Sequence, residues 1–581
     1  QSVNDGDAQT IFYQDNLNDI NISFSYKDSS FGNFDVPNGA IIHMEEEHHD
    51  EDEDHDEEEE HEEENLGYLA NSDFASESLK FGASTNGDWG FIGFSVASIE
   101  SMYGIPFHGE EHEDEHGEEE GEHDEHEGER IFSNTESDKF DVRGSFNIDS
   151  NLVSKVDFFI RDTDYSLTEQ HAEEEEHEEE GHDEDEHEGH EEGPTTFTND
   201  ALEAGFIFDL SNDLMSQKFA LNFVNEDTSV LGSEAFMNPA SRDELTFGYY
   251  ISRDISDYTL DFGVRIDRLA NEGSISAAHE EEEHHDEDEG HEEEEHDEHD
   301  EHEEMETAFY DKSFNNTSLA FNIGRELNDF ISVDLGFASV ERAPSSIELF
   351  MNGAHLATGR FEVGNVNLQS ETSNNVDLTV SIDNAGFFAS ATLFANKVDN
   401  YIYLRDETEE EHEDHDEEHE EDHDEHGGLI LSNYLQQDAD LDGYEIEFGN
   451  TMELGSGELT MSFGRDAISG NFANGGNIPR LNPARNIFKL KYSKDDMTLG
   501  LNFKDVEKQN DIAVNETLTA GYQMLNAKLS RTIDFGSQGE LTLSLFGNNM
   551  LDEVARNHSS FVKNEVPLPG RNYGLRFNLK L

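Results

Sequence analysis

Segments in which apolar and polar residues alternate one by one recur along most of this chain. Residues 260–266 read Leu-Asp-Phe-Gly-Val-Arg-Ile, which puts four apolar side chains on one face, and 376–380, 499–503 and 541–545 follow the same rule. A period of two residues is that of a half-buried β-strand, because successive side chains of a strand point to opposite faces of the sheet. The alternation therefore predicts an all-β protein.

The connections between these segments come in two lengths. Some are short and turn-like, such as 211–213, 383–386 and 493–496, and the others are long. Short turns at one end of a sheet and long loops at the other are typical of an outer-membrane β-barrel. At roughly 20 residues per strand and connection, the part of the chain without its acidic stretches predicts about 22 strands. We therefore predict one large transmembrane antiparallel β-barrel spanning residues 1–581.

Five stretches of the chain, here called the acidic blocks, consist almost only of Glu, Asp and His. They cover residues 43–64, 108–129, 171–192, 279–306 and 406–426 and hold 27 of the 29 histidines. Such charge density cannot form a packed core, so we expect disordered extracellular loops. Imidazole beside carboxylate, in a chain with no cysteine, is ligand chemistry for a borderline divalent cation such as zinc. Composition does not distinguish zinc from copper(II), nickel or cobalt.

The net charge of the chain limits the kinds of molecule that it can bind. The chain carries 139 acidic and 33 basic side chains, a formal net charge of −106. Nucleic acid is excluded as a partner because phosphate binding needs concentrated Lys and Arg, whereas cations are attracted. No run of 18 apolar residues predicts a membrane helix, and Gln1 does not begin a secretory leader. These features fit an exported protein of the bacterial outer membrane.

Other classes explain less of the sequence. A soluble propeller would show a repeat of about 40–50 residues, which is not found. A soluble metal-storage protein is a third class, and it predicts solubility without detergent. His-Glu-x-x-His occurs at 112–116 and 419–423, the spacing of a zinc protease, but blocks of this composition match it by chance. We therefore predict no enzyme. Residues 438–443 resemble the start of a calcium loop, yet Gly449 stands where such a loop needs a bidentate Glu.

Candidate metal ligands fall into two groups. Glu348 and His355 flank a loop opening and form a plausible zinc pair; the alternative is a Glu that holds the loop backbone beside a surface histidine. His558 also lies outside the blocks, and a structural role in its loop is favoured. His108 and His112 join the pair of Glu348 and His355 as possible donors near the mouth. The second group is a set of exchangeable imidazoles within the acidic blocks: His108, His112, His116, His171, His177, His284, His285, His412, His415 and His419.

Two segments resemble the TonB-dependent outer-membrane receptors. Residues 341–350, Glu-Arg-Ala-Pro-Ser-Ser-Ile-Glu-Leu-Phe, with 361–375 after them, are similar to the central barrel of that family, and 545–573 to its last two strands and the loop between them. Tyr103-Gly-Ile-Pro-Phe-His108, leading into a histidine-rich loop, and 558–561 are most similar to the zinc-uptake receptors. The resemblance implies a barrel in outer-membrane lipid that imports zinc, driven by the inner-membrane TonB energy-coupling complex through a plug.

The sequence departs from that pattern in three ways. Strand-like sequence begins near Gln9, so the N-terminal plug of the family is not seen in this chain; Leu581 stands where the family ends in an aromatic residue; and the acidic blocks are longer than a few ligands require. We expect Arg342 and Arg571 to pair with carboxylates. The predicted function is capture and import of a divalent metal ion, zinc first. The alternative is a receptor for a metal complex or another nutrient, whose acidic loops serve only as a cation buffer or surface shield.

Overall fold

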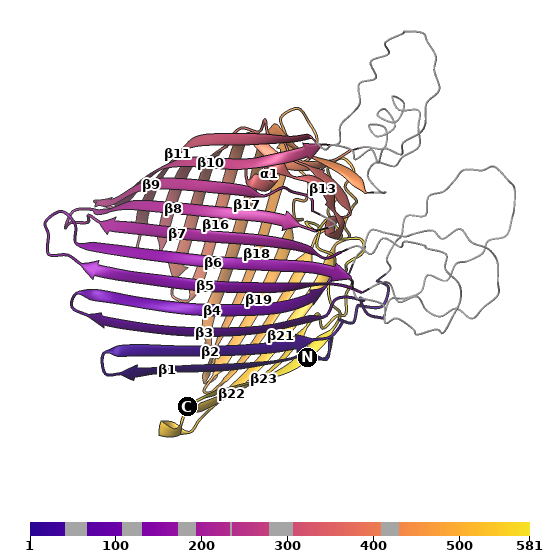
Figure 1. The fold of residues 1–581 in the computed structure, drawn as a ribbon. Helices are drawn as coiled ribbons and strands as arrows, with labels where there is room; N and C mark the ends of the chain where they lie inside the picture. The colour runs from indigo at the N-terminus through magenta and orange to yellow at the C-terminus, as the bar shows by residue number, and fades with distance from the viewer. Residues whose placement is uncertain (41–66, 107–129, 172–192, 233–234, 278–305, 408–428) are drawn as a thin grey trace, which may run out of the picture.

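The chain forms one large β-sheet that curves into a barrel (Figure 1). The computed structural model describes residues 1–581 except 41–66, 107–129, 172–192, 233–234, 278–305 and 408–428. The sheet has 23 strands, and its long neighbouring strands pair antiparallel in chain order. The described part contains a single short α-helix, α1 (Ser346–Phe350), and no described helix has the length and apolar character to cross a bilayer. The predicted all-β barrel is confirmed.

The strands differ in length. Two of them, β13 (Asn352–His355) and β14 (Arg360–Val363), are short pieces in the loop after β12. The long strands are β1 (Asp7–Leu17), β2 (Ile20–Phe31), β3 (Phe74–Gly87), β4 (Gly90–Gly104), β5 (Ile131–Asn147), β6 (Lys155–His171), β7 (Thr195–Asp209), β8 (Ser216–Leu231), β9 (Ala240–Ile255), β10 (Tyr258–Ala277), β11 (Glu306–Asn328), β12 (Ile331–Arg342), β15 (Glu371–Asn384), β16 (Phe387–Asp406), β17 (Ile430–Leu454), β18 (Gly457–Phe472), β19 (Arg485–Lys494), β20 (Met497–Val506), β21 (Tyr522–Asp534), β22 (Glu540–Asn548) and β23 (Asn572–Lys580).

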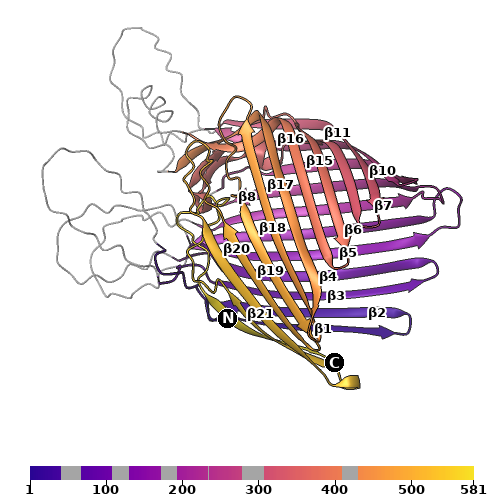
Figure 2. The same ribbon diagram turned by 180° about the vertical axis from the view of Figure 1, so that it is seen from behind.

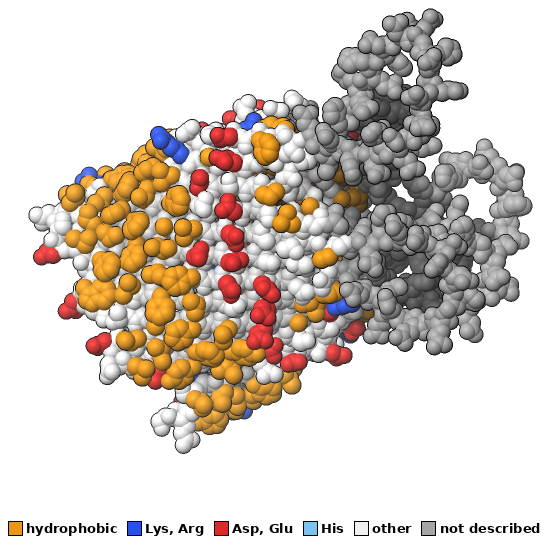
Figure 3. Space-filling view, in the orientation of Figure 1, with side chains coloured by type: hydrophobic (Ala, Val, Ile, Leu, Met, Phe, Trp, Pro, Cys, Tyr) orange, Lys and Arg blue, Asp and Glu red, His pale blue; other side chains and the backbone are white. Residues whose placement is uncertain are grey.

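The apolar residues of the alternating segments lie on the outer face of the barrel wall, and the residues between them lie on the inner face. Phe262 of β10 lies opposite Phe321 of β11 and Ile251 of β9, and Phe262 and Phe321 are 40 % and 38 % exposed. Side chains of this kind form a continuous apolar band on the outside of the barrel (Figure 3). A barrel in lipid needs this arrangement, because its outside faces hydrocarbon while its closed ladders satisfy the backbone.

The two ends of the barrel differ as the connections predict. Turns such as 18–19, 256–257 and 495–496 join strands at one end. The other end, here called the mouth, carries the connections β2–β3, β4–β5, β6–β7, β10–β11 and β16–β17, which contain all five acidic blocks (Figures 1 and 2). Because successive strands run in opposite directions, the blocks are attached to one rim only.

Residues 438–443, which resemble the start of a calcium loop, lie within β17, where Asp440 and Asp442 pair with β16 as ladder residues, so the rejection of the calcium loop agrees with the structure. One detail differs from the sequence prediction. The acidic blocks reach into the wall, because His171 ends β6 and Asp406 ends β16. Glu306 likewise begins β11, and Glu407 follows β16; the other block residues lie outside the described part of the chain.

A small hydrophobic core fills part of the mouth. Leu349 and Phe350 of α1 are fully buried and pack with Phe236, Met237 and Val230. α1 begins at a capping box, in which Ser345 and Glu348 each bond to the backbone of the other. This core holds the loop after β12 against the wall formed by β7–β11 and so fixes the position of β13 and β14.

Candidate functional site

A hollow of about 460 Å³ lies at the mouth, on the inner side of the wall; we call it the mouth hollow. One side comes from β4, β6 and β7, and the other from the loop that follows β12. Its upper edge, 104–106, leads directly into the second acidic block, and β6 ends at the third. The lining residues are Tyr103, Gly104, Ile105, Pro106, Tyr165, Leu167, Glu169, Phe197, His355 and Ala357.

His355, at the end of β13, is held in place by a buried carboxylate. Its Nδ1 lies 2.9 Å from Glu362 Oε1, and the Glu362 side chain is only 5 % exposed. The ring of Phe236 packs on the imidazole with 4.9 Å between ring centroids. Because a carboxylate accepts, Nδ1 is the nitrogen that carries the proton, which leaves Nε2 with a free lone pair. A histidine oriented in this way is prepared for a metal ion.

Glu362 is itself held by hydroxyl groups. The Thr358 hydroxyl has two acceptors, the His355 carbonyl oxygen at 2.9 Å and Glu362 Oε1 at 3.1 Å, and the Tyr434 hydroxyl lies 3.5 Å from Oε2. The antiparallel pairing of β13 with β14, which places Ala354 opposite Phe361 and His355 opposite Arg360, brings Glu362 and His355 together. The short β13–β14 hairpin and Tyr434 of β17 therefore hold Glu362 and His355 in their relative positions.

Glu169 supplies a second donor to the mouth hollow. It lies on β6 near the end of the strand, close enough to His355 for the two side chains to interact electrostatically. Carboxylate oxygen with imidazole nitrogen suits zinc and related ions. In the described part of the chain no three His, Asp or Glu side chains converge into a complete metal cage. The hollow therefore offers two protein donors and leaves positions open for water.

Glu348 does not share this hollow with His355. Its carboxylate receives two hydrogen bonds from Arg342 Nη1, at 3.1 and 2.9 Å, and one from the Ser345 backbone at 2.7 Å. Glu348 thus holds the loop backbone, which was the alternative to a zinc pair. The carboxylate partner of His355 is Glu362. Arg342 also reaches Glu371 at 3.4 Å, and Arg571 lies 3.7 Å from Asp552, so the expected pairing of both arginines with carboxylates is confirmed.

His558 lies in a separate buried cluster of the mouth loops. Its Nε2 is 3.0 Å from Glu516 Oε1, although not in the geometry of a well-directed hydrogen bond, and its Nδ1 is 2.8 Å from the Thr519 hydroxyl. Lys563 Nζ lies 3.3 Å from the same Nδ1. Burial lowers the pKa of the Lys563 ammonium, and the charge of Glu516 only partly offsets this effect. The ammonium beside the imidazole opposes a second cation, which supports the structural role of His558.

Next to this cluster, two arginine side chains share one carboxylate and lie over one aromatic ring. Arg360 donates two hydrogen bonds to Asp406, at 3.0 and 2.8 Å, with both side chains 8 % exposed. Arg480 lies 3.7 Å from the same carboxylate. The guanidinium groups of both arginines face the ring of Phe561, at 4.5 and 3.6 Å from its centroid. The group ties β14, β16 and two mouth loops together.

The remaining sequence candidates are placed only in part. His171 is the last residue of β6, two positions after Glu169. Glu169 and Glu362 are missed by the sequence prediction because only the folded chain brings them close to His355: Glu362 through the pairing of β13 with β14, and Glu169 through the position of the loop after β12. The one sequence signal is that Glu169 stands two residues before an acidic block. Outside the described residues lie His108, His112, His116, His177, His284, His285, His412, His415 and His419.

Comparison with solved structures identifies the fold. The copper transporter OprC matches all of this chain over 79 % of its own length, with a TM-score of 0.68 and 12 % identity. The FrpB iron transporter from Neisseria meningitidis matches 98 % of this chain over 79 % of its own length, with a TM-score of 0.65 and 12 % identity. The Serratia marcescens hemophore receptor HasR matches 97 % of this chain over 77 % of its own length, with a TM-score of 0.63 and 11 % identity. These matches show a common barrel.

Sequence comparison supplies the family. Residues 119–550 match the model described as TonB dependent receptor-like, beta-barrel. That span covers most of the wall and includes Glu169, His355 and Glu362. The members of this family and the similar structures are receptors and transporters of the bacterial outer membrane. The chain therefore belongs to the TonB-dependent receptor β-barrel family and is an outer-membrane transporter.

Proposed function

We propose that this transporter imports a divalent metal ion, zinc in the first place, and that the mouth hollow holds the ion on its way inward. The observation that supports this most strongly is His355, whose Nδ1 is bonded to a buried carboxylate while its ring lines a hollow shared with Glu169. A carboxylate behind the ring fixes the tautomer and the orientation of the imidazole.

Three steps lead the ion inward in this proposal. The acidic blocks raise the local concentration of cations by their charge. Neutral imidazoles then favour zinc and similar ions over calcium and magnesium, which prefer oxygen ligands. Finally the ion passes to His355 and Glu169, at the foot of the second and third blocks, and enters the lumen with TonB-dependent coupling through a plug.

A titration at two pH values tests the imidazole role. Protonated imidazole cannot bind a metal, so zinc bound by the purified chain should fall sharply between about pH 7.5 and about pH 5, on either side of the ordinary histidine pKa. Magnesium binding, which depends on carboxylates, serves as the control and should change much less over this range. Equal zinc affinity and stoichiometry at both pH values would refute the role of histidine.

A second candidate function is import of an anionic metal complex. The inner wall of β19–β23 carries exposed basic side chains, Lys489, Lys491, Lys528 and Arg576, around a hollow of about 630 Å³. A cationic wall suits a negatively charged complex better than a free cation. In this case the acidic blocks act only as a cation buffer or surface shield.

Deletion of the five acidic blocks separates the two functions. If free zinc is the substrate, cells that depend on this protein should grow more slowly in zinc-limited medium without the blocks. Unchanged growth would favour the metal-complex function. The double change Lys491→Glu and Lys528→Glu is the matching test, because it should impair uptake of an anionic complex and leave uptake of free zinc unaffected.

A further inference from the structure

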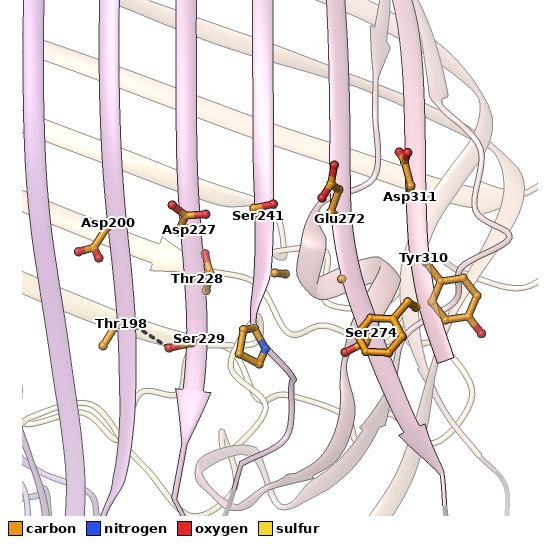
Figure 4. Close-up of a pocket in the computed structure, with 14 residues that line it drawn as sticks. Thr198, Asp200, Asp227, Thr228, Ser229, Ser241, Glu272, Ser274, Tyr310 and Asp311 are labelled. Carbon is orange, nitrogen blue, oxygen red and sulfur yellow. Dashed lines mark hydrogen bonds between the residues drawn. The ribbon is translucent and has the colours of Figure 1, made fainter. Parts of the chain in front are cut away.

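A buried hydroxyl without a hydrogen-bond partner lies beside the mouth hollow. Ser133 of β5 is 0 % exposed, and its Oγ is the one fully buried hydroxyl oxygen in the described part of the chain that makes no hydrogen bond. Elsewhere in the wall, hydroxyl groups that face each other across two strands are paired, as Thr198 and Ser229 are at 2.7 Å (Figure 4). An unpaired buried hydroxyl lowers the stability of a fold, so Ser133 requires an explanation.

Ser133 lies directly between two residues that line the mouth hollow. It is opposite Tyr103 of β4 on one side and opposite Glu169 of β6 on the other. Residues that are directly opposite in an antiparallel ladder point to the same face of the sheet, with Cβ atoms about 4.5–5.5 Å apart. The Ser133 hydroxyl is therefore on the inner face of the wall, within reach of the Glu169 carboxylate.

Glu169 is the better acceptor of these two neighbours. The Tyr103 hydroxyl is close enough to Ser133 for the two groups to interact, but the pair does not have the geometry of a hydrogen bond. An ionised carboxylate can only accept, and a serine hydroxyl always carries a proton to donate. Hydrogen bonds to a charged acceptor are also stronger than those between neutral groups. A Glu169 carboxylate that turns toward Ser133 would therefore satisfy the hydroxyl best.

Carboxylates that bind metal ions are usually hydrogen-bonded themselves. A carboxylate that gives one oxygen to an ion keeps its second oxygen free to accept such a bond. The nitrogen donor of the mouth hollow already has support of this kind, because Glu362 holds His355 and the Thr358 hydroxyl in turn contacts Glu362. On the oxygen side, Ser133 stands directly opposite Glu169, where it can give the same support.

We propose that Ser133 is a positioning residue of the mouth hollow, whose hydroxyl donates to one oxygen of Glu169 while the other oxygen binds the zinc ion. This inference rests on the proposed function, because it needs an ion shared by Glu169 and His355. The hydrogen bond keeps the carboxylate facing His355 and at the same time satisfies the buried hydroxyl. Ser133 thus does for the oxygen donor what Glu362 does for the nitrogen donor.

The test measures uptake of radioactive zinc by cells that depend on this protein, with the KM and the maximal rate determined separately. Ser133→Ala should raise the KM for zinc about 10-fold and leave the maximal rate nearly unchanged, because it weakens the hold on the ion. The control is Ser137→Ala, the same change at the next inward position of β5, which is opposite Tyr165 instead of a carboxylate and should leave the KM unchanged. All variants keep the acidic blocks, so zinc bound by the blocks cancels in the comparison.

A double-mutant comparison shows whether Ser133 acts through Glu169. In a Glu169→Ala chain the acceptor is gone, so adding Ser133→Ala should leave the KM where Glu169→Ala alone puts it. If Ser133 served only to keep β5 in shape, its removal would raise the KM by the same factor in both backgrounds, and the proposal would be overturned. An unchanged KM in the Ser133→Ala single variant would overturn it as well.

Thermal unfolding without metal tests the same proposal independently of uptake. Ser133→Ala should melt at the same temperature as the unaltered chain or higher, because it removes an unpaired buried hydroxyl. A lower melting temperature would mean that the hydroxyl already has a partner in the metal-free chain, and would overturn the proposal.

Two further variants separate the role of Ser133 from the proposed function. If neither His355→Ala nor Glu169→Ala raises the KM, zinc does not use the mouth hollow and the proposed function fails. If both raise the KM and Ser133→Ala does not, the proposed function stands and only the role of Ser133 is overturned.

Discussion

Two regions of this barrel gather carboxylates, and they do so for opposite surroundings. At the mouth hollow a buried carboxylate, Glu362, lies behind the lining residue His355 and is bonded to its imidazole and to two hydroxyl groups. On the outer wall exposed carboxylates face each other across neighbouring strands, as Asp164 faces Asp200 and Asp200 faces Asp227 (Figure 4). The first arrangement uses a carboxylate to aim a nitrogen donor, whereas the second presents bare oxygens.

The difference teaches that charge alone does not define a cation site. Both regions are acidic, but only the mouth hollow adds imidazole, which favours zinc and its neighbours, while an all-oxygen surface favours calcium and magnesium. The other side of the outer wall supports the contrast, because there Lys397 lies opposite Asp440 and Arg465 pairs with Glu507 at 2.6 Å. We therefore expect zinc uptake to depend on the mouth hollow and not on the carboxylates of the outer wall.

Removal of the imidazole should have the largest effect. His355→Ala deletes the nitrogen donor of the mouth hollow, and we expect zinc uptake by cells at limiting zinc to fall about 100-fold. Uptake of radioactive zinc measures this directly. The outer-wall variant that combines Asp200→Asn and Asp227→Asn should take up zinc as the unaltered chain does, and an equal loss in both variants would break the separation of the two regions.

Removal of the supporting charge should have the next largest effect. Glu362→Gln keeps the size of the side chain but weakens the hold on Nδ1 of His355, so zinc uptake should fall about 10-fold. Glu447→Gln, which alters a carboxylate on β17 that pairs with Lys489 at 3.7 Å, is the matched control and should leave uptake unchanged. Equal effects of both substitutions would mean that Glu362 acts only through net charge.

Acid should separate the two regions without any mutation. Imidazole loses its metal-binding form on protonation near pH 6.5, whereas ordinary carboxylates remain charged to about pH 4. Equilibrium dialysis of the purified chain at about pH 5.5 should therefore show most of the zinc binding lost while magnesium binding by carboxylates persists. Simultaneous loss of both responses on acidification would show that they share one set of ligands.

The buried cluster around His558 should make the stability of the mouth loops depend on pH in the acidic range. Burial raises the pKa of the Glu516 carboxyl, but the close imidazole of His558 and hydrogen bonds from the Ala513 and Arg480 backbones outweigh burial and leave this pKa below its ordinary value. A carboxyl with a depressed folded-state pKa contributes stability above its unfolded pKa, and this contribution is lost as pH falls through the folded value. Protection of the 549–571 loop from proteolysis should therefore weaken below about pH 4.5, and Glu516→Gln should flatten that dependence.

The smallest effect is expected from the outer wall where charges are paired. The double change Lys397→Met and Asp440→Asn removes one exposed pair of the β16–β17 ladder. Exposed ion pairs contribute about 0–1 kcal/mol, so the melting temperature and the uptake of zinc should hardly change. A loss of zinc uptake as large as that of Glu362→Gln would show that acidic residues of the outer wall also serve the ion.

The barrel wall could be predicted from the sequence because its rules are local. Alternation and turn length fix the strands, and connection length fixes the rim that carries the acidic blocks. The role of Glu348 was also open to prediction, since Ser345-x-x-Glu348 is the signature of a capping box. A zinc pair was the competing interpretation of the same residues, and the ion pair with Arg342 decides against it.

The mouth hollow could not be predicted in the same way. Glu169 and His355 lie far apart in the chain, and only the continuous ladder from β6 to β12, with the loop after β12 folded against it, brings them to one hollow. Glu362 reaches His355 through a hairpin of two four-residue strands, which leaves no recognisable period in the sequence. The facing carboxylates of the outer wall likewise depend on register, since each of them is an ordinary acidic residue at the end of an apolar run.

The most direct test of the central claim is anomalous X-ray diffraction at the zinc absorption edge, from crystals of this protein exposed to zinc at about pH 7.5. The account predicts a peak about 2.0–2.1 Å from His355 Nε2, on the Glu169 side of the ring. The peak should disappear in His355→Ala crystals. A strong zinc peak elsewhere in the lumen, with His355 Nε2 left without metal, would contradict the assignment of the mouth hollow.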